Sequence, residues 1–265
     1  MRGRFWSVLG LALICAPGAV RAGAWTMDES HGQIIATGTF SVATQAYDNS
    51  GSAVSIPRYR KFELEPLLEY GVTDRFTLMF GSTLQHVDIA SPVDASRTGF
   101  GYTEVGGRYR FWQNDGWVFS GQSLLRIPGT ANDRNPAAIG YTDPEVDMRL
   151  LFGKSFNIGP LPAFVDLEPA QRFRAGDPPN EFRFDATFGI QFTPQWMLLL
   201  QSLNVISEGA GSSFFFPSYD YEKFQVSVVY NFAPSWAVQL GGYRTYTGRN
   251  ALLENALITG LWYRF

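Results

Sequence analysis

Short turn segments flanked by aromatic residues recur five times along the chain, about 35 to 45 residues apart. Amphipathic aromatic rings settle at the boundary between hydrocarbon and water, where the strand ends of a transmembrane barrel lie. The spacing therefore predicts antiparallel strands that cross a membrane, with these turns along one interface. The segments are residues 70–76, 111–117, 156–164, 192–196 and 232–236, and the sequence ends on Phe265.

Many segments alternate apolar and polar residues with a period of two, which is typical of strands with two different faces. The clearest are residues 181–192, 61–70 and 224–232. Weaker versions are roughly residues 33–46, 76–88, 99–112, 117–127, 144–156, 162–174, 196–206, 236–247 and 256–265. Tilted segments of about 10 residues can cross a bilayer, whereas the mean strand of a soluble sheet has about 5–6 residues. We expect an all-β fold, a transmembrane antiparallel up-and-down β-barrel of about 12 strands.

The connections between these strands fall into two classes. Short turns with Gly, Pro, Asn or Asp follow every second strand. Longer polar connections occupy residues 47–59, 89–98, 128–143, 175–180, 207–220 and 248–255. Bacterial outer-membrane barrels have short periplasmic turns and longer extracellular loops. The pattern predicts that both termini lie in the periplasm and that the strand number is even.

A soluble β-sandwich is the competing fold, because it also has alternating strands and turn signals. Its apolar faces would pack against a second sheet. In this chain the opposite face carries charges of both signs, and aromatic residues recur at fixed strand ends. A sandwich core requires neither feature, so the barrel is favoured.

The first 24 residues have the organisation of a secretory signal peptide. Basic Arg2 and Arg4 precede an apolar stretch over residues 5–20, and small residues follow it. A transmembrane helix is the alternative, but the stretch contains Pro17 and is shorter than the ~20 residues that a spanning helix needs. We expect cleavage after Ala22 or Ala24, with residues 1–24 as signal peptide and residues 25–265 as one barrel domain.

The single cysteine, Cys15, lies inside the signal peptide. A lipoprotein cysteine follows a small residue, but Ile14 precedes Cys15 and apolar sequence continues beyond it, so lipidation is disfavoured. The mature chain would then contain no cysteine, which rules out disulfides and thiolate metal sites.

Composition excludes several classes of function. The formal net charge is −3, the mean hydropathy is −0.08, and 15% of the residues are aromatic. These values indicate neither a polybasic nucleic-acid surface nor a strongly acidic tail. No apolar stretch of 18 residues follows the signal peptide, so helical membrane spans are not expected.

The last residues, Gly260-Leu261-Trp262-Tyr263-Arg264-Phe265, resemble the C-terminal signal of outer-membrane proteins. In that signal a glycine is followed by spaced aromatic residues and a terminal Phe. The resemblance implies that Gly260, Tyr263 and Phe265 are recognised by the barrel-assembly machinery during insertion. It also implies the bacterial outer membrane as the location, with outer-membrane lipids and lipopolysaccharide as neighbours. Ile258 departs from the polar residue often found two places before the glycine.

Residues near the mature N-terminus resemble the XagA-like group of outer-membrane proteins, which are associated with exopolysaccharide gene clusters. The matching segments are Ala24-Trp25-Thr26, Gly32-Gln33-Ile34-Ile35, Glu63-Leu64-Glu65-Pro66 and Glu69-Tyr70-Gly71-Val72-Thr73-Asp74-Arg75. They cover about the first quarter of the chain. The resemblance implies a role in polysaccharide export or surface assembly, and no catalytic residue.

The alternation places acidic and basic residues in nearly equal number on the inward face. The acidic set is Glu63, Glu65, Glu69, Glu104, Glu145, Asp147, Asp166, Glu168, Glu181 and Asp185. The basic set is Lys61, Arg108, Arg110, Arg126, Arg149, Arg172, Arg174, Arg183, Lys223, Arg244 and Arg264. On three consecutive strands these charges lie close enough for cross-strand pairing, which predicts a salt-bridged wall.

The mixed charge of the inward face is compatible with three functions. The preferred interpretation is a passive pore or export conduit for small polar or saccharide solutes, since twelve strands fall between a filled barrel and a wide channel. The expected lining is Glu63, Glu65, Glu104, Arg108, Arg110, Glu145, Asp147, Arg149, Arg172 and Arg183. The alternative is a surface or assembly barrel whose lumen is sealed by ion pairs. A lipid-modifying enzyme is the third interpretation.

No catalytic, metal or cofactor site is expected. Outer-membrane acyl hydrolases need a serine with a nearby histidine base. Only His31 and His86 are present, and neither shows a His-x-Ser pairing, although Ser82 and Asp88 lie near His86 in sequence. There are no His clusters, no calcium-loop spacing and no phosphate-binding glycine motif.

One connection departs from the polar norm, because Phe214 to Phe216 stand together at a predicted loop tip. Exposed aromatic clusters are unusual unless something covers them. We expect this segment to fold inward as a partial constriction or to touch the outer leaflet.

Overall fold

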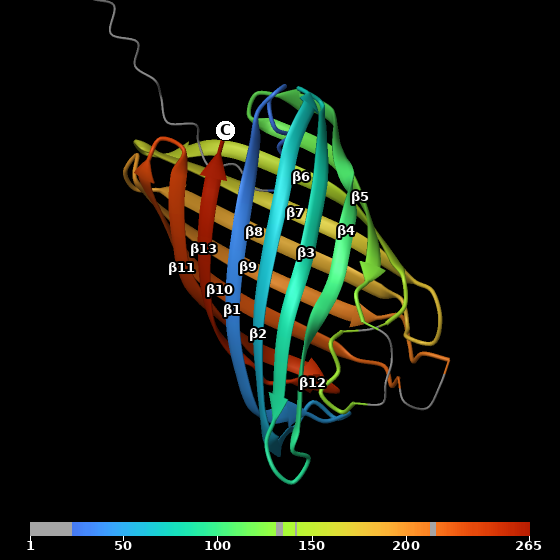
Figure 1. Cartoon of the computed structure of the whole chain (residues 1–265). Helices are drawn as coiled ribbons and strands as arrows, with labels where there is room; N and C mark the ends of the chain where they lie inside the picture. The colour runs from blue at the N-terminus through green and yellow to red at the C-terminus, as the bar shows by residue number, and fades with distance from the viewer. Residues whose placement is uncertain (1–22, 131–134, 141, 213–215) are drawn as a thin grey trace, which may run out of the picture.

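The computed structural model describes residues 23–130, 135–140, 142–212 and 216–265. These residues form one antiparallel sheet that closes on itself as a barrel. From β1 to β11 each strand pairs with the next in sequence, β11 pairs with β13, and β1 pairs with β2, β12 and β13 (Figure 1). The strands are β1 (Gly32–Tyr47), β2 (Ala53–Thr73), β3 (Phe76–Ile89), β4 (Ala95–Asn114), β5 (Trp117–Pro128), β6 (Glu145–Ile158), β7 (Leu161–Arg174), β8 (Glu181–Gln191), β9 (Trp196–Ser207), β10 (Asp220–Ala233), β11 (Trp236–Arg249), β12 (Ala251–Leu252) and β13 (Asn255–Arg264).

The barrel has twelve strands around its circumference, because β12 and β13 are two parts of one interrupted strand. Both pair with β1, β13 with Val42 opposite Asn255 and β12 with Ala46 opposite Leu252, and the register shifts by one residue between them. Backbone hydrogen bonds between Gly32 and Phe265, at 2.8 and 3.0 Å, complete the closure. The predicted twelve-stranded up-and-down barrel is confirmed.

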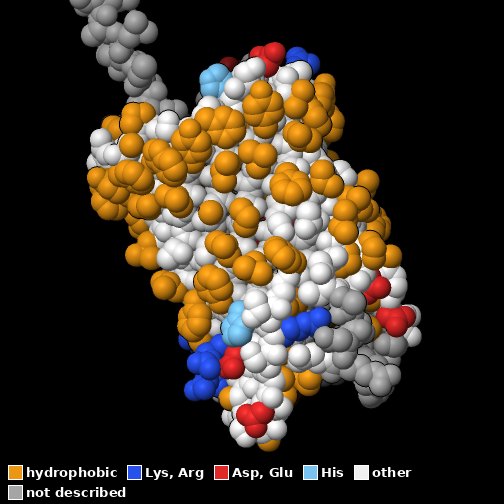
Figure 2. All heavy atoms as spheres, in the orientation of Figure 1, with side chains coloured by type: hydrophobic (Ala, Val, Ile, Leu, Met, Phe, Trp, Pro, Cys, Tyr) orange, Lys and Arg blue, Asp and Glu red, His pale blue; other side chains and the backbone are white. Residues whose placement is uncertain are grey.

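The outer surface is apolar where the strand alternation predicts it. Side chains such as Phe184, Leu240 and Leu261 are exposed on the wall. Hydrophobic side chains cover the visible face in a broad belt, while charged side chains gather at the two ends (Figure 2). A belt of this kind matches the lipid-facing surface of membrane barrels. The described residues contain no helix long and apolar enough to span a membrane.

The aromatic-flanked turns all lie at the barrel end that holds the C-terminus, at the top of Figure 1. Rings such as Trp117, Phe192 and Phe232 are about half exposed there. Trp236 and Tyr263 lie 4.6 Å apart between ring centroids, and Tyr263 stacks on Phe265 at 5.7 Å. By the predicted orientation this is the periplasmic end, and the opposite end is extracellular.

Two expectations about the connections need correction. The connection predicted over residues 248–255 is a tight turn at Asn250, whose φ is 47°, because Ala251–Leu252 pair with β1 as β12. The loop predicted over residues 47–59 spans only the residues between Tyr47 and Ala53, because β2 continues past the membrane.

Candidate functional site

The lumen contains the residues that the alternation placed inward. A cavity of about 540 Å³ extends along the lumen from Leu199 and Trp262 to Lys223, and a second cavity of about 310 Å³ shares part of its lining. Of the predicted lining residues, Glu63, Glu65, Glu104 and Arg183 border the larger cavity. Glu104, Arg108, Asp147, Arg149 and Arg172 border the smaller one.

The remaining predicted residues have other positions. Glu145 is 1% exposed and is enclosed by arginines. Arg110 is half-buried near the periplasmic end, where its backbone N–H donates to the carbonyl of Arg75. The inward position predicted for Arg244 is wrong, because its neighbours Tyr243 and Thr245 take the inward positions and leave Arg244 exposed.

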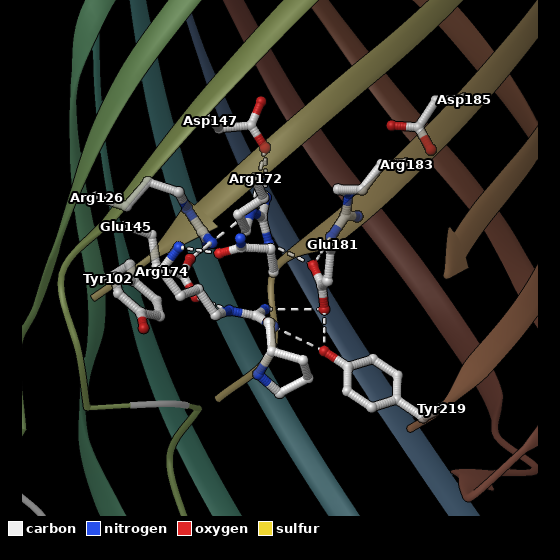
Figure 3. A network of polar contacts seen from close by, with 12 residues as sticks. Tyr102, Arg126, Glu145, Asp147, Arg172, Arg174, Glu181, Arg183, Asp185 and Tyr219 are labelled. Atoms are coloured by element: carbon white, nitrogen blue, oxygen red, sulfur yellow. Dashed lines mark hydrogen bonds and ion pairs between the residues drawn. The ribbon is translucent and has the colours of Figure 1, made fainter. Parts of the chain in front are cut away.

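A continuous set of ion pairs covers the inner face of β4 to β8, and we call it the ionic wall (Figure 3). Glu145 lies at its extracellular end and pairs with Arg126 and with Arg174, the latter at 2.5 Å. Arg126 also reaches Glu104 at 2.6 Å, and Arg174 also reaches Glu181 at 2.8 Å. The predicted salt-bridged wall is confirmed. Nearly every charge in it has a partner of opposite sign, so the wall is rigid and close to neutral.

Deeper in the lumen the ionic wall is richer in acids. Arg172 bridges Asp147 at 2.9 Å and Glu181 at 3.5 Å. Arg149 is shared among Asp147 at 3.6 Å, Asp185 at 2.8 Å and Glu168. The guanidinium of Arg149 is therefore shared by three carboxylates at this depth of the lumen.

A smaller polar cluster occupies the opposite side of the lumen near its extracellular end. Lys223 pairs with Glu254 at 2.6 Å, and Glu254 accepts a hydrogen bond from Ser41 at 3.0 Å. Lys61 pairs with Glu63 at 2.9 Å, and the ammonium of Lys223 lies 4.6 Å from the ring centroid of Tyr243. Lys61 and Lys223 line both the larger cavity and an outer cavity of about 270 Å³.

The residues that precede β1 cross the lumen at its periplasmic end. We call Gly23 to His31 the N-terminal segment. Ser120 on β5 donates to the carbonyl of Ala24 at 2.5 Å, and Arg108 on β4 donates to the carbonyl of Trp25 at 3.0 Å. Met27 donates its N–H to Thr77 on β3 at 2.8 Å. The segment therefore runs across the lumen from the β5–β7 side to β3 before it enters β1.

Trp25 is the apolar anchor of the N-terminal segment. It is 3% exposed and meets Phe164 edge-on, with ring centroids 5.7 Å apart. It belongs to an apolar cluster inside the barrel, formed by Ala24, Trp25, Val118, Leu151, Phe164, Met197, Leu199, Val229, Ala237 and Trp262. Burial of a large indole among such side chains stabilises the segment in this position. The periplasmic end of the lumen is therefore packed with apolar side chains, whereas the ion pairs of Glu145 and Glu254 lie toward the extracellular end.

The N-terminal segment and the apolar cluster are functional features that the strand alternation did not reveal. Strand β9 carries the relevant signal, because Met197 to Leu200 are apolar on both faces of the strand. An inward face that is apolar at one end only requires an apolar occupant there. Residues 24–31 have no strand periodicity, and their partners lie far along the chain.

The two histidines lie outside this arrangement. His31 is exposed and its Nδ1 is 2.9 Å from the carbonyl oxygen of Glu29. His86 is also exposed, and its Nδ1 is 2.7 Å from the hydroxyl of Thr98. Within the described residues, no group of three or more His, Cys, Asp or Glu side chains is placed to hold a metal ion. Phe214 and Phe215 lie outside the described residues, so the constriction expected there stays a prediction.

Comparison with known families gives one match that covers most of the chain. The model of the family described as "Putative MetA-pathway of phenol degradation" matches residues 38–265. This is not the XagA-like group expected from the N-terminal resemblance. No curated protein sequence matches the chain.

Several solved structures share the barrel. An outer-membrane channel of the COG4313 group from Pseudomonas putida F1 superposes with a TM-score of 0.78 at 16% identity, over 91% of this chain and 98% of that chain. The NanC porin gives 0.56 at 10% identity, over 87% of this chain and 98% of the porin. The KdgM porin, solved with disordered oligogalacturonate, gives 0.53 at 11% identity, over 88% and 99%. These matches show that the fold is that of outer-membrane barrels.

Proposed function

The chain belongs to the family described as "Putative MetA-pathway of phenol degradation", and we propose that it is an outer-membrane channel for small amphipathic solutes. In this proposal the solute enters from the extracellular side, occupies the cavities of the lumen and leaves when the N-terminal segment moves. The ionic wall keeps the barrel rigid while the solute passes.

The observation that carries the proposal is the mixed lining of the larger cavity. Its apolar lining includes Ile35, Leu67, Leu199, Leu203, Ile258 and Trp262. The same cavity is lined by the charged groups of Lys61, Glu63, Glu104 and Arg183. Its volume of about 540 Å³ suits a small ligand. A solute with an aromatic ring and one or two polar groups can contact both kinds of lining residue, which agrees with the phenol in the family description.

A small saccharide is the second candidate, because tyrosines stand among the polar groups near the extracellular end. Tyr59, Tyr219 and Tyr221 border the outer cavity together with Asn250. Such rings can stack on the apolar face of a sugar. The exopolysaccharide export expected from the XagA-like resemblance belongs to this second candidate. It is less favoured, because the N-terminal segment crosses the route that a polymer would take.

Single-channel recording in planar bilayers tests both candidates. With 4-hydroxybenzoate on the extracellular side, we expect concentration-dependent block of the current. Leu203→Gln should raise the half-blocking concentration roughly 10-fold, since losing contact with an apolar side chain costs about 1.4 kcal/mol. Thr39→Ser, at a polar position of the same cavity, is the matched control and should change little.

The alternative functions predict different single-channel current recordings. Block by maltose but not by 4-hydroxybenzoate would replace the phenolic solute with a saccharide. No measurable current, from wild type or from a variant without the N-terminal segment, would contradict a channel and support the sealed surface barrel.

A further inference from the structure

Gly23, the first residue of the N-terminal segment, lies inside the lumen beside two carboxylates of β7. A Cβ on Gly23 would overlap Oδ2 of Asp166 and would come within 2.6 Å of Oε1 of Glu168. The φ of Gly23 is 69°, a conformation that favours glycine. The next residue, Ala24, donates its N–H to Oδ1 of Asp166 at 3.2 Å. Backbone and carboxylates are therefore in direct contact at this point.

Asp166 has no ion pair among the described residues, and the only cation paired with Glu168 there is the shared Arg149. Asp166 is 1% exposed, and its Oδ2 has no hydrogen-bond partner among the described residues. Glu168 shares Arg149 with Asp147 and Asp185. The next guanidinium, that of Arg108, is held by Glu69 at 3.0 Å. Two adjacent buried carboxylates must share a proton or acquire a cation.

We propose that the signal peptide is cleaved between Ala22 and Gly23, and that the new α-ammonium of Gly23 is the counter-ion of Asp166 and Glu168. Hydrolysis of the Ala22–Gly23 amide by the leader peptidase consumes one water molecule. It leaves a carboxylate on Ala22 of the released leader and a protonated amine on Gly23. The amine nitrogen is one bond of about 1.46 Å from the Gly23 Cα that contacts Asp166.

This assignment decides between the two cleavage positions that the sequence allows. Cleavage after Ala24 would remove the N–H that bonds Asp166 and the carbonyl that accepts from Ser120. It would also place the new charge at Trp25, whose side chain is buried in the apolar cluster. Cleavage after Ala22 keeps these contacts and supplies the missing cation. Processing of the leader thus creates the ion pair that fastens the N-terminal segment inside the barrel.

The first test is the intact mass of the folded protein purified from outer membranes. We expect a chain that begins at Gly23. A chain that begins at Trp25 or at any other residue would overturn the proposal.

The second test is the reactivity of the α-amine toward an acetylating N-hydroxysuccinimide ester, measured by mass spectrometry of the N-terminal peptide. In the folded wild type we expect labelling of Gly23 at least roughly 10-fold below that of the unfolded chain, a difference of about 1.4 kcal/mol. The double variant Asp166→Asn/Glu168→Gln should lose this protection. Glu63→Gln, which removes a lumen carboxylate paired with Lys61, is the matched control and should keep it.

A second variant keeps the proposal testable if the double variant does not fold. Insertion of Ser-Gly between Gly23 and Ala24 leaves every barrel residue in place but moves the amine away from Asp166. It should expose the amine to the reagent. Equal labelling of folded and unfolded wild type, or protection that neither variant changes, would overturn the assignment of the Gly23 amine as the counter-ion of Asp166 and Glu168. Neither test measures transport, so both are independent of the proposed channel.

Discussion

Gly153, on the inner face of β6, leaves the space that the indole of Trp25 occupies. A Cβ at this position would lie 2.7 Å from Cη2 of Trp25 and 3.0 Å from Cβ of Ala24. Real Cβ atoms do not approach other atoms this closely, so one of the two must move. The position of the N-terminal segment therefore depends on the absence of a single methyl group.

We expect Gly153→Ala to displace Trp25 and to destabilise the barrel by about 1–3 kcal/mol, the usual cost of overpacking. Guanidinium unfolding followed by tryptophan fluorescence measures this change. Gly81→Ala is the matched control, because a Cβ there meets its nearest neighbour at an ordinary 3.5 Å. An equal effect of the two substitutions would contradict the role assigned to Gly153.

At the residue scale the period-two pattern predicted the direction of most charged side chains. It placed Glu145, Asp147 and Arg149 on one inward face, and they lie there. It failed for Arg244, because the register of β11 turns Tyr243 and Thr245 inward. It could not predict Trp25, whose neighbours come from strands far along the chain.

At the scale of elements, the extracellular connections contain two aspartates with opposite electrostatic environments. Asp48 accepts hydrogen bonds from the Ser50 hydroxyl and N–H at 2.7 Å and from the Ser52 N–H at 3.0 Å. These bonds favour the ionised form and lower the pKa of Asp48, the Ser50 hydroxyl contributing most. Burial and the negative charge of Asp177 raise the pKa of Asp143.

The two aspartates should therefore respond to pH with opposite sign. The lowered pKa of Asp48 stabilises its turn above the unfolded pKa of about 4, and this contribution is lost as pH falls through the folded pKa. The raised pKa of Asp143 means that its loop is most stable when the carboxyl is protonated, and stability is lost as pH rises through the folded value.

We expect Asp48→Asn to lower hydrogen-exchange protection of its turn at about pH 7, and Asp143→Asn to raise protection of its loop. Both differences should shrink as the pH is lowered below the unfolded pKa of about 4, because the carboxyls become protonated in wild type. Protection factors are the proper measure, because they remove the intrinsic pH dependence of exchange. Changes of the same sign at pH 7 would contradict the assignment.

Strand positions were predictable, but strand lengths were less so. The run predicted over residues 61–70 is the membrane-crossing part of β2, which extends from Ala53 to Thr73. Outside the bilayer both faces of a strand meet water, so the alternation fades while backbone pairing continues, as between Gln45 and Ser55. The short strand β12 was missed because two residues carry too little pattern.

At the scale of the whole molecule, the barrel is asymmetric in two ways. Its ionic wall covers only β4 to β8, and its apolar cluster lies at the periplasmic end, where the N-terminal segment crosses the lumen. A sealed structural barrel would need no cavity of mixed apolar and charged lining beside a separately held segment. The asymmetry instead fits a channel whose resting state is closed by its own N-terminus.

The most direct test is the single-channel conductance of a variant that lacks residues 24–30 and retains β1. We predict a conductance several times that of wild type, because the deletion removes Trp25 and the backbone that crosses the lumen. Deletion of residues 49–51, in the extracellular turn before β2, is the control and should leave conductance unchanged. Equal conductance of wild type and the variant lacking residues 24–30, with both barrels folded, would contradict closure by the N-terminal segment.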